Sequence, residues 1–416
     1  MKIIPSHSIN SDRDARRPRV IIVGGGFGGL YAAKSLGNAP VEVLLIDRRN
    51  FHLFQPLLYQ VATGGLSPGD IASPLRAVLN KYRNIRVIKG EVVDIDPAGR
   101  LVQVRRPGTG DLEAFSYNYL IVGVGVRHHY FGNEEWCTLA PGLKTIEDAL
   151  EIRKRIFTAF EEAEWERDPD RQRALMTFVV VGGGPTGVEL AGALAELSHF
   201  TLKKDFRNID PTRARILLIE AGERILPTYP PGLSRKAQRA LERLGVTVMT
   251  HTLVADVQSG QVRIRRGERE ETVPAGTVLW AAGVRGAPMG HILAEKTGAT
   301  QDPLGRIKVE SDLSIPGHPE IMVIGDLAHF AHQTGEPLPG IAPVAMQQGR
   351  YAARRIKALA KGKRVPPFRY FDKGSLAVIG RNAAVADLGR FKLSGWIAWV
   401  LWVFIHIAYL IEFDNK

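Results

Sequence analysis

The sequence predicts an α/β protein, because one combination of apolar strand, glycine-rich turn and small-residue helix occurs twice. The first copy is RVIIVGGGFGGL at residues 19–30, and the second is FVVVGGGPTGVELAGALAE at residues 178–196. In each copy an apolar run of strand length leads into glycines spaced G-x-G-x-x-G. Such a turn places free backbone N–H groups of a helix N-terminus where a pyrophosphate can bind. The predicted fold is therefore two Rossmann-like dinucleotide-binding domains.

The first copy carries its glycines at Gly24, Gly26 and Gly29. The next apolar strand, residues 41–46, is closed by Asp47, which lies 18 residues after Gly29. A dinucleotide-binding domain places near this position the acid that accepts hydrogen bonds from a ribose. Further strands at residues 85–88 and 119–122, with an antiparallel meander between them, are expected to complete the domain.

The second copy has glycines at the same spacing, Gly182, Gly184 and Gly187. Its acid, Glu220, closes an apolar strand at residues 216–219. Each copy ends on another glycine 101 residues after its first one, Gly125 in the first copy and Gly283 in the second. Because the two spans are equal, we interpret the two copies as an internal duplication. The interior spacings differ because the second copy carries a basic insertion at residues 198–215.

The charge balance predicts an anionic partner. Lys and Arg number 55 against 43 Asp and Glu, which gives a formal net charge of +12. The partner could be nucleic acid or an anionic membrane surface. The alternative is an ordinary basic protein surface that binds no such partner. We expect no nucleic acid, because the basic residues are scattered and no recognised nucleic-acid motif accompanies them.

The chain has a single cysteine, Cys137. One thiol cannot form an intramolecular disulfide, a redox-active pair or a four-cysteine iron–sulfur site. Four histidines lack the spacing and the carboxylate or cysteine support of a metal site: His128, His129, His329 and His332. The sequence therefore predicts neither dithiol chemistry nor a bound metal.

Residues 395–411, GWIAWVLWVFIHIAYLI, form an apolar run of 17 residues with His406 as its only ionisable group. A membrane-spanning helix needs roughly 20 residues. Tryptophan and tyrosine suit a membrane interface, and basic residues precede the run at Arg381, Arg390 and Lys392. The sequence favours a helix that lies at a membrane surface, with a buried core or dimer helix and a single span as alternatives.

The two glycine turns, their two acids and a later apolar strand entering Gly325-Asp326 resemble the flavoproteins with two dinucleotide-binding domains, of the pyridine nucleotide-disulfide oxidoreductase type. Among these, the chain is most similar to the type II NADH:quinone oxidoreductases, the single-subunit NADH dehydrogenases that pump no protons. The stretches that carry this similarity are FHLFQPLLYQVATGG at residues 51–65, residues 182–189, APVAMQQG at 342–349, KGSLAVIGRNAAVAD at 373–387 and the apolar C-terminus.

This resemblance implies that the first copy binds FAD, with Asp47 at its adenosine ribose and Gly325 and Asp326 at its ribityl chain. The second copy would bind NADH as substrate, because the Glu220 carboxylate repels the 2′-phosphate of NADPH, although Arg224 lies nearby. The residues expected to bind NADH are Gly182, Gly184, Gly187, Glu220 and Gly283. Hydride would pass from NADH to FAD, and electrons would pass on to a membrane quinone. Disulfide reductases and sulfide:quinone oxidoreductases of this fold need cysteines that this chain lacks.

The resemblance also gives the expected domain organisation. We expect a disordered arm at residues 1–17, an FAD domain in two parts at 18–144 and 284–360, an inserted NADH domain at 145–283, and a C-terminal hairpin with an apolar membrane-attachment helix at 361–416. The tail would insert into one leaflet, so the protein would be a peripheral membrane protein on the cytoplasmic face of the inner (cell) membrane, in contact with anionic lipid. A second copy of the chain is a further candidate partner.

Glu189 and Gln347 are the predicted catalytic residues. By resemblance Glu189 points towards flavin and nicotinamide, where it would either orient the nicotinamide carboxamide or relay a proton to quinone, and a plain helix-stabilising acid is the alternative. Gln347 would contact flavin or quinone, with Lys373 and Leu376 at the quinone entrance, and an exposed helical glutamine is the alternative. The family often has a glutamine where this chain has Pro343, a residue that favours the start of a helix.

Two other functions fit the same fold. A soluble NAD(P)H-dependent reductase of a ferredoxin-type carrier would need no apolar tail and would use the basic surface for an acidic partner protein. An NADH-sensing flavoprotein would bind both dinucleotides and transfer few electrons.

Overall fold

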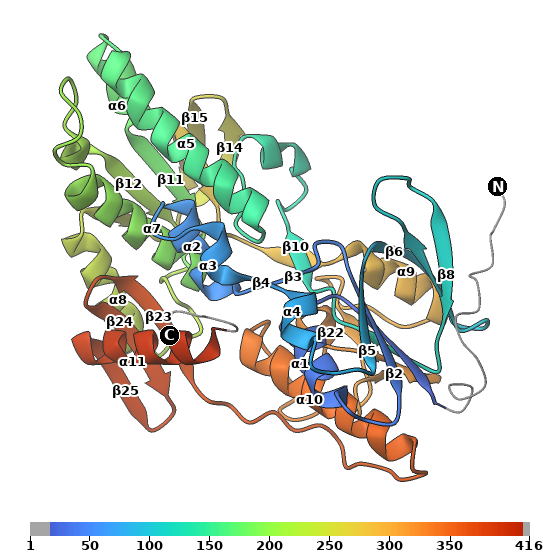
Figure 1. The fold of residues 1–416 in the computed structure, drawn as a ribbon. Helices are drawn as coiled ribbons and strands as arrows, with labels where there is room; N and C mark the ends of the chain where they lie inside the picture. Colours follow the sequence, from blue (N-terminus) through green and yellow to red (C-terminus); the bar gives the residue numbers. More distant parts are fainter. Residues whose placement is uncertain (1–16, 411–416) are drawn as a thin grey trace. The chain divides into compact units, whose positions relative to one another are not determined.

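A computed structural model describes residues 17–410, and these residues form two compact units (Figure 1). Unit 1 contains the chain up to Leu53, Ala72–Arg127 and Val284–Asp372. Unit 2 contains Phe54–Ile71, His128–Gly283 and the chain from Lys373 onwards. The predicted N-terminal arm, apart from residue 17, and the last residue of the predicted apolar run lie outside the described residues.

Unit 1 is built on a six-stranded sheet with the order β20-β21-β9-β1-β2-β5. Its strands are β1 (Arg19–Val23), β2 (Glu42–Asp47), β5 (Ile85–Lys89), β9 (Tyr119–Val122), β20 (Ser314–Ile315) and β21 (His318–Val323). All neighbouring strands are parallel except β20 and β21. The apolar runs of the sequence form the central strands because a parallel strand covered by helices is buried on both faces.

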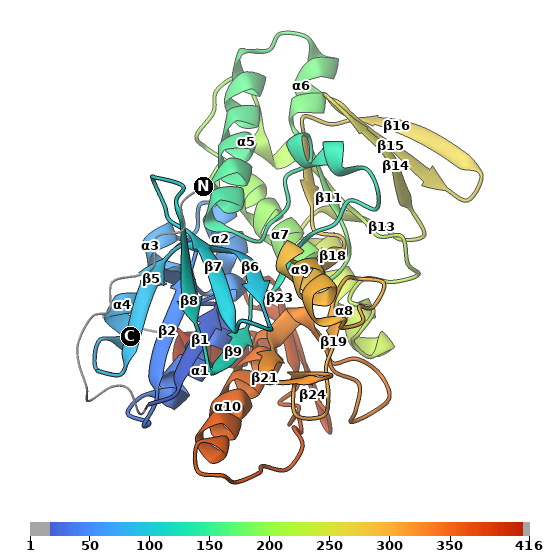
Figure 2. The same cartoon turned by 90° about the vertical axis from the view of Figure 1, so that its right-hand side faces the viewer.

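Helices α1 (Phe27–Leu36) and α10 (Ala342–Leu359) lie side by side in unit 1 (Figure 1 and Figure 2). A Cβ at Gly349 would lie 2.2 Å from the Gly28 carbonyl oxygen, so only glycine permits this approach. The other elements of unit 1 are β3 (Phe51–Leu53), β4 (Ala72–Pro74), α4 (Leu75–Leu79), β6 (Glu91–Asp96), β7 (Leu101–Arg105), β8 (Leu112–Ser116), β18 (Val284–Gly286), α9 (Pro288–Thr297), β19 (Ile307–Lys308) and β22 (Ala328–His329). Strands β6, β7 and β8 form the expected antiparallel meander.

Unit 2 repeats the central plan of unit 1. Its parallel sheet has the order β13-β12-β11-β17, which corresponds to β5-β2-β1-β9 of unit 1. The strands are β11 (Thr177–Val181), β12 (Arg215–Ile219), β13 (Val246–Met249) and β17 (Thr277–Trp280). Val179, Leu217 and Trp280 belong to one buried apolar cluster on this sheet. The same strand order in both units is what an internal duplication predicts.

Helices and a second meander surround this sheet. The antiparallel strands β14, β15 and β16 are paired in sequence order and are seen at the upper right of Figure 2. A capping box between Thr145 and Asp148 fixes the start of α5, since each side chain accepts a hydrogen bond from the other residue's backbone N–H. The elements are α2 (Leu58–Ala62), α3 (Pro68–Ile71), α5 (Ile146–Trp165), α6 (Pro169–Leu175), α7 (Pro185–Glu196), α8 (Pro231–Arg243), β14 (Leu253–Gln258), β15 (Gln261–Arg266) and β16 (Arg269–Pro274); β10 (Val126–His128) connects the units along the chain.

The C-terminal segment of unit 2 forms an antiparallel sheet of β23 (Ser375–Gly380), β24 (Ala383–Leu388) and β25 (Phe391–Gly395), followed by α11 (Trp396–Tyr409) (Figure 1). The sequence predicts the first hairpin but not the third strand. Helices α7 and α8 contact β23, and α11 packs on β24. Within residues 17–410, no helix combines the length and the apolar character needed to cross a membrane.

Candidate functional site

In the first glycine-rich turn, two of the three predicted glycines are required by close contacts within the protein, and the third is not. Gly24 has a φ of +98°, and a Cβ there would lie 2.6 Å from the Gly123 carbonyl oxygen. A Cβ at Gly29 would lie 1.8 Å from the Gly24 carbonyl oxygen, where α1 crosses β1. Gly26 has no atom within 4 Å of its Cβ position. The turn therefore needs glycine at two positions for its own packing and leaves open space at the third.

That open space lies at the N-terminus of α1. Gly26 is the N-cap residue, and no side chain caps the helix there. The first backbone N–H groups of a helix lack partners inside the helix, and its N-terminus carries a partial positive charge. The uncapped N–H groups and the open space beside them suit a pyrophosphate. A Cβ at Gly26 would occupy part of that space, which explains the glycine.

The second glycine-rich turn has the same construction. Gly182 has a φ of +109°, and its Cβ would lie 2.8 Å from the Ala281 backbone. A Cβ at Gly187 would lie 1.8 Å from the Gly182 carbonyl oxygen, and the Cβ position of Gly184 is open to 4 Å. Gly184 caps α7, again without a side-chain cap, and a proline begins the helix. The second cradle therefore suits a second pyrophosphate.

The two predicted acids occupy equivalent positions and hold their turns. Asp47 Oδ2 accepts a hydrogen bond of 2.7 Å from the Gly25 backbone N–H. Glu220 Oε2 accepts one of 2.6 Å from the Gly183 N–H, and its Oε1 accepts from the Gly222 N–H at 2.6 Å. The sequence predicts the acids as ribose ligands but does not indicate these loop contacts. Each carboxylate therefore joins the end of a strand to the second of the three consecutive glycines in the neighbouring turn, Gly25 or Gly183.

Gly325 and Asp326 follow β21 in unit 1, as the sequence predicts. Gly325 has a φ of +70°, and its N–H donates a 2.6 Å hydrogen bond to Gln348 Oε1. Gln348 is fully buried on α10, so this bond ties the Gly-Asp turn to that helix. The sequence pattern points to Gln347 and gives no sign of a role for Gln348, because the two glutamines are adjacent and have the same chemistry.

Gln347 uses its amide within unit 1. Its Nε2 donates to the Phe371 carbonyl oxygen at 2.9 Å, and its Oε1 accepts from the Phe371 N–H at 3.0 Å. This pairing holds the chain just before it enters the C-terminal sheet. Helix α10 begins at Ala342 with Pro343 in its first turn, which matches the predicted helix start.

Glu189 lies on α7, one turn into the helix and half-buried. Burial raises the pKa of its carboxyl from 4.5 to about 8, and a hydrogen bond from the Val378 N–H acts in the opposite direction. Two buried phenols, Tyr59 on α2 and Tyr229 before α8, interact electrostatically with this carboxyl. A carboxylic acid in this setting keeps its proton at neutral pH, which is the property that a proton donor needs.

Lys373 and Leu376 lie in the C-terminal part of unit 2, next to α11. Lys373 Nζ and Tyr409 Oη are 3.0 Å apart, so the lysine reaches the last turn of the apolar helix. Leu376 is half-buried on β23. The rings of Phe54 and His406 meet edge to face at 6.0 Å. The structure therefore adds Tyr409 to the surroundings of the predicted quinone entrance, and it places Phe54 against the same helix at His406.

Gly283 ends the second dinucleotide-binding repeat, as its spacing predicts. It has a φ of +69°, and a Cβ there would lie 2.7 Å from the Phe131 ring. Its carbonyl oxygen accepts a hydrogen bond from the His129 N–H at 3.4 Å. A larger residue would disturb both contacts.

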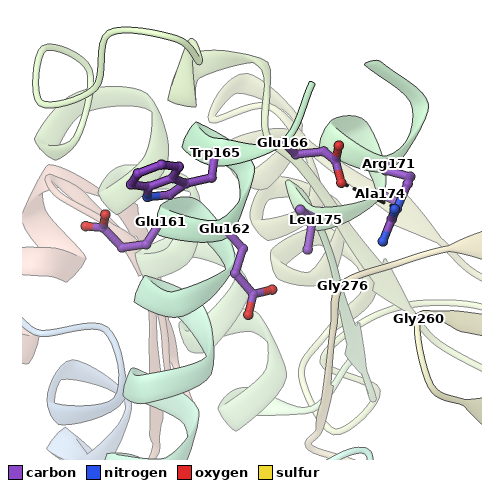
Figure 3. A pocket seen from close by; sticks show the side chains of 9 residues that line it. All are labelled: Glu161, Glu162, Trp165, Glu166, Arg171, Ala174, Leu175, Gly260 and Gly276. Carbon is purple, nitrogen blue, oxygen red and sulfur yellow. Dashed lines mark ion pairs between the residues drawn. The ribbon is translucent and has the colours of Figure 1, made fainter. Parts of the chain in front are cut away.

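An open pocket at the C-terminal end of α5 belongs to a different part of unit 2 (Figure 3). Its lining is acidic and contains a largely exposed tryptophan: Glu161, Glu162, Trp165, Glu166, Arg171, Ala174, Leu175, Gly260 and Gly276. Glu166 pairs with Arg171 across it at 3.4 Å. None of the predicted site residues lines this pocket, so it is not part of the candidate site.

Comparison with known proteins decides among the functions that this geometry allows. Residues 18–349 match the family described as pyridine nucleotide-disulphide oxidoreductase. The type II NADH:quinone oxidoreductase Ndh of Mycobacterium tuberculosis is 45% identical over 405 residues, which cover 96% of this chain and 86% of that protein. The chain belongs to the type II NADH:quinone oxidoreductases.

Solved structures confirm the predicted fold class. NDH2 of Plasmodium falciparum, solved in complex with RYL-552, matches with a TM-score of 0.87 at 23% identity over 95% of both chains. A sulfide:quinone oxidoreductase of Aquifex aeolicus matches with a TM-score of 0.74 at 19% identity over 94% of this chain and 90% of that one. These likenesses concern the fold, and the membrane attachment of the C-terminal segment stays a prediction.

Membership of the family also establishes the activity. Type II NADH:quinone oxidoreductases depend on FAD, take electrons from NADH and pass them to a quinone without pumping protons. These enzymes are associated with membranes. The predicted enzyme class and cofactors are thereby confirmed, and this activity is favoured over the ferredoxin-type reductase and the NADH sensor.

Proposed function

We propose that the first glycine-rich turn of this oxidoreductase holds the pyrophosphate of FAD and the second holds that of NADH. The observation that supports this most directly is the pair of open cradles at Gly26 and Gly184, each at a helix N-terminus without a side-chain cap. Asp47 and Glu220 would orient the adenosine riboses, and Gly325 with Asp326 would bind the ribityl chain of FAD. FAD, when bound, accepts a hydride from NADH and passes the two electrons on to the quinone.

Glu189 is proposed to supply a proton when the quinone is reduced. A quinone that takes up two electrons also takes up two protons, and a carboxyl with a pKa of about 8 holds a proton at neutral pH. Gln347, Lys373 and Leu376 are proposed to line the path of the quinone. The positive N-terminal end of α10, which begins at Ala342, is proposed to stabilise the negative charge of reduced flavin.

The exposed face of α11 is proposed to attach the enzyme to the cytoplasmic face of the cell membrane. Trp396, Ile397 and Phe404 are 62%, 61% and 69% exposed, whereas Ala398 and Trp402 are buried. A folded protein seldom leaves so much apolar surface on one short helix unless a partner covers it. Exposed basic residues in the turns and the last strand of the C-terminal sheet suit anionic lipid: Arg381, Arg390 and Lys392. The same apolar face is also available to a second copy of the chain.

The activity is tested by following the flavin itself. The purified enzyme should lose its oxidised flavin absorption when NADH is added without oxygen, and a soluble quinone analogue should restore it at catalytic rates. Oxidised flavin that fails to return after the quinone is added would contradict the proposed electron path.

The double substitution Ile397→Glu and Phe404→Glu should release the enzyme from membranes while leaving NADH oxidation by soluble dyes nearly unchanged. Burying a charge in the apolar part of a bilayer is strongly unfavourable, and both side chains are exposed, so the fold itself should tolerate the change. Sedimentation with vesicles of anionic lipid measures the effect. Phe200→Glu is the matched control, because Phe200 is 68% exposed in the same unit but lies outside α11. Full sedimentation of the double variant would contradict attachment through α11. A wild-type dimer that dissociates in the double variant would favour the second-copy alternative.

Glu220→Gln should reduce the preference for NADH over NADPH, measured as the ratio of the two kcat/KM values, by on the order of tenfold. The carboxylate repels the 2′-phosphate of NADPH, and the amide removes that charge while keeping an acceptor oxygen for one of the two N–H groups that Glu220 binds. Glu223→Gln is the control, because Glu223 is a neighbouring acid without a bond to the turn. An unchanged ratio in Glu220→Gln would show that another residue excludes the phosphate.

A further inference from the structure

Strand β23 forms one edge of the C-terminal sheet, whose order is β23-β24-β25. An edge strand has backbone N–H and C=O groups on its outer side that no neighbouring strand pairs. The register of β23 is also interrupted: Val378 lies opposite Ala384 and Gly380 opposite Ala383, so Ile379 is an extra residue in a β-bulge. A bulge turns backbone groups away from the regular ladder and towards a neighbouring element.

The neighbouring element at this edge is α7, which begins at the second glycine-rich turn. A Cβ at Gly192 would lie 1.7 Å from the Ile379 carbonyl oxygen and 2.9 Å from its carbonyl carbon. The backbone of α7 at Gly192 thus rests directly on the backbone of the bulge. Any residue with a Cβ at this position would keep the two backbones farther apart. Glycine in mid-helix lowers helix stability by roughly 1 kcal/mol relative to alanine, so this position follows from the contact and not from helix propensity.

Glu189 lies one helical turn before Gly192, on the same face of α7. Its carboxylate accepts a hydrogen bond from the Val378 N–H, the residue just before the bulge. The close contact at Gly192 therefore brings an edge N–H of β23 within reach of the Glu189 carboxyl. The strand that supplies this N–H continues directly from Lys373 at the predicted quinone entrance.

We propose that Gly192, together with the bulge at Ile379, positions Glu189 by clamping α7 onto the edge of β23, so that the Val378 N–H orients the carboxyl. Gly192 is a positioning residue in this proposal, since it acts through Glu189. The C-terminal sheet then has a role inside the enzyme besides carrying α11. The effect of this contact on turnover rests on the proposed role of Glu189 as a proton donor. The clamp, meaning the contact of Gly192 with Ile379 that holds α7 on β23, does not depend on that role.

The titratable groups that face Glu189 are few. Tyr59 approaches from α2, and Tyr229 approaches from the segment before α8. Glu196 at the end of α7 interacts with Tyr59, and Asp387 on β24 interacts with Tyr229. No basic group contributes to the shift at Glu189. Loss of the Val378 hydrogen bond, which favours the charged form, should therefore raise the pKa of the carboxyl further.

The test is the titration of the Glu189 carboxyl carbon by NMR in holoenzyme labelled with 13C-glutamate, the signal being assigned by its absence in Glu189→Gln. In Gly192→Ala we expect the midpoint to rise by about one pH unit, because a hydrogen bond to the charged form is lost. Gly276→Ala is the matched control: its Cβ would lie 2.8 Å from the Leu175 Cα in the same unit, so the fold is strained but Glu189 is not touched. Its midpoint should stay at the wild-type value.

Val378→Pro is the second variant, which keeps the test open if Gly192→Ala does not fold. Proline removes the donor N–H itself, and an edge strand tolerates proline where that N–H faces outwards. It should give the same upward shift. Wild-type midpoints in both variants would overturn the clamp. A carboxyl that shifts as expected while the pH dependence of quinone reduction stays fixed would leave the clamp standing and contradict the proposed proton donation by Glu189.

Discussion

Alanine at Gly29 is expected to yield protein without bound FAD, whereas alanine at Gly187 is expected to yield protein that keeps FAD but no longer oxidises NADH. In each case the new Cβ would lie 1.8 Å from the carbonyl oxygen of the first glycine of the turn. Two such atoms need more than 3 Å, so α1 or α7 must move away from its strand by more than an ångström. The N–H groups of the cradle move with the helix.

The size of these effects follows from the precision that the cradle needs. A misplacement of about 1 Å in the groups that position a bound reactant can lower the reaction rate by a factor on the order of 10². Flavin content after gel filtration measures FAD retention, and anaerobic bleaching by NADH measures the second site. The two variants are controls for each other, because the two turns have the same geometry but belong to different units. Normal flavin content in Gly29→Ala would contradict the assignment of the first turn to FAD.

Gly26→Ala and Gly184→Ala separate binding from folding. Neither new Cβ meets a protein atom within 4 Å, so the unfolding temperature of protein stripped of cofactor should remain within about 2 °C of the wild-type value. Affinity for FAD in the first variant and for NADH in the second should still fall by tenfold or more, since the methyl group occupies the cradle. Unchanged affinities would show that the pyrophosphates bind elsewhere.

The glycine spacing and the strand pattern were sufficient to predict both dinucleotide-binding units. The reason is that these residues belong to one recurring motif: Gly24 and Gly182 need positive φ, Gly29 lies against its own turn, and in each copy an acid closes the next strand of the motif. The duplicated strand order agrees with the short continuous apolar runs of both copies, because a parallel strand that is buried on both faces carries apolar residues at every position. The start of α10 could likewise be predicted from Pro343 alone.

Contacts between distant segments could not be predicted in the same way. The bond from Gly325 to Gln348 joins residues 23 positions apart. Nothing in the sequence shows that Gly192 rests on Ile379, because a single glycine in a small-residue helix has no pattern that names its partner. Residues 54–71 follow the first glycine-rich turn in the sequence but belong to unit 2. Such pairings depend on the tertiary structure within each unit, and the spacing of apolar residues along the chain does not predict it.

Glu189→Gln should slow quinone reduction by a factor on the order of 10² or more while flavin reduction by NADH stays close to the wild-type rate. The wild-type carboxyl has a pKa of about 8, so it is protonated at neutral pH and loses its proton above that value. Quinone reduction by the wild type should therefore decline as the pH rises through about 8. The amide cannot titrate, so the slow reaction of the variant should lack this decline. Stopped-flow measurement of the two half-reactions separates them.

The same carboxyl makes a prediction about stability, with a sign that can be worked out. Its pKa is about 8 in the folded enzyme and near its ordinary value of 4.5 in the unfolded chain. Between these values the folded state binds more protons, so the free energy of unfolding falls as the pH rises. Glu189→Gln removes this contribution. Its stability relative to the wild type should therefore increase between about pH 5 and about pH 8.5.

Urea unfolding of the two proteins at both ends of that range measures the difference, with Glu161→Gln as the control because Glu161 is an exposed acid of the same unit. A relative stability that stays constant with pH would mean that Glu189 is already ionised at neutral pH. In that case it could not donate a proton to the quinone, and a slow Glu189→Gln variant would have to be explained by lost contacts with the substrate. The stability measurement thus decides between proton donation and substrate binding without any reference to turnover.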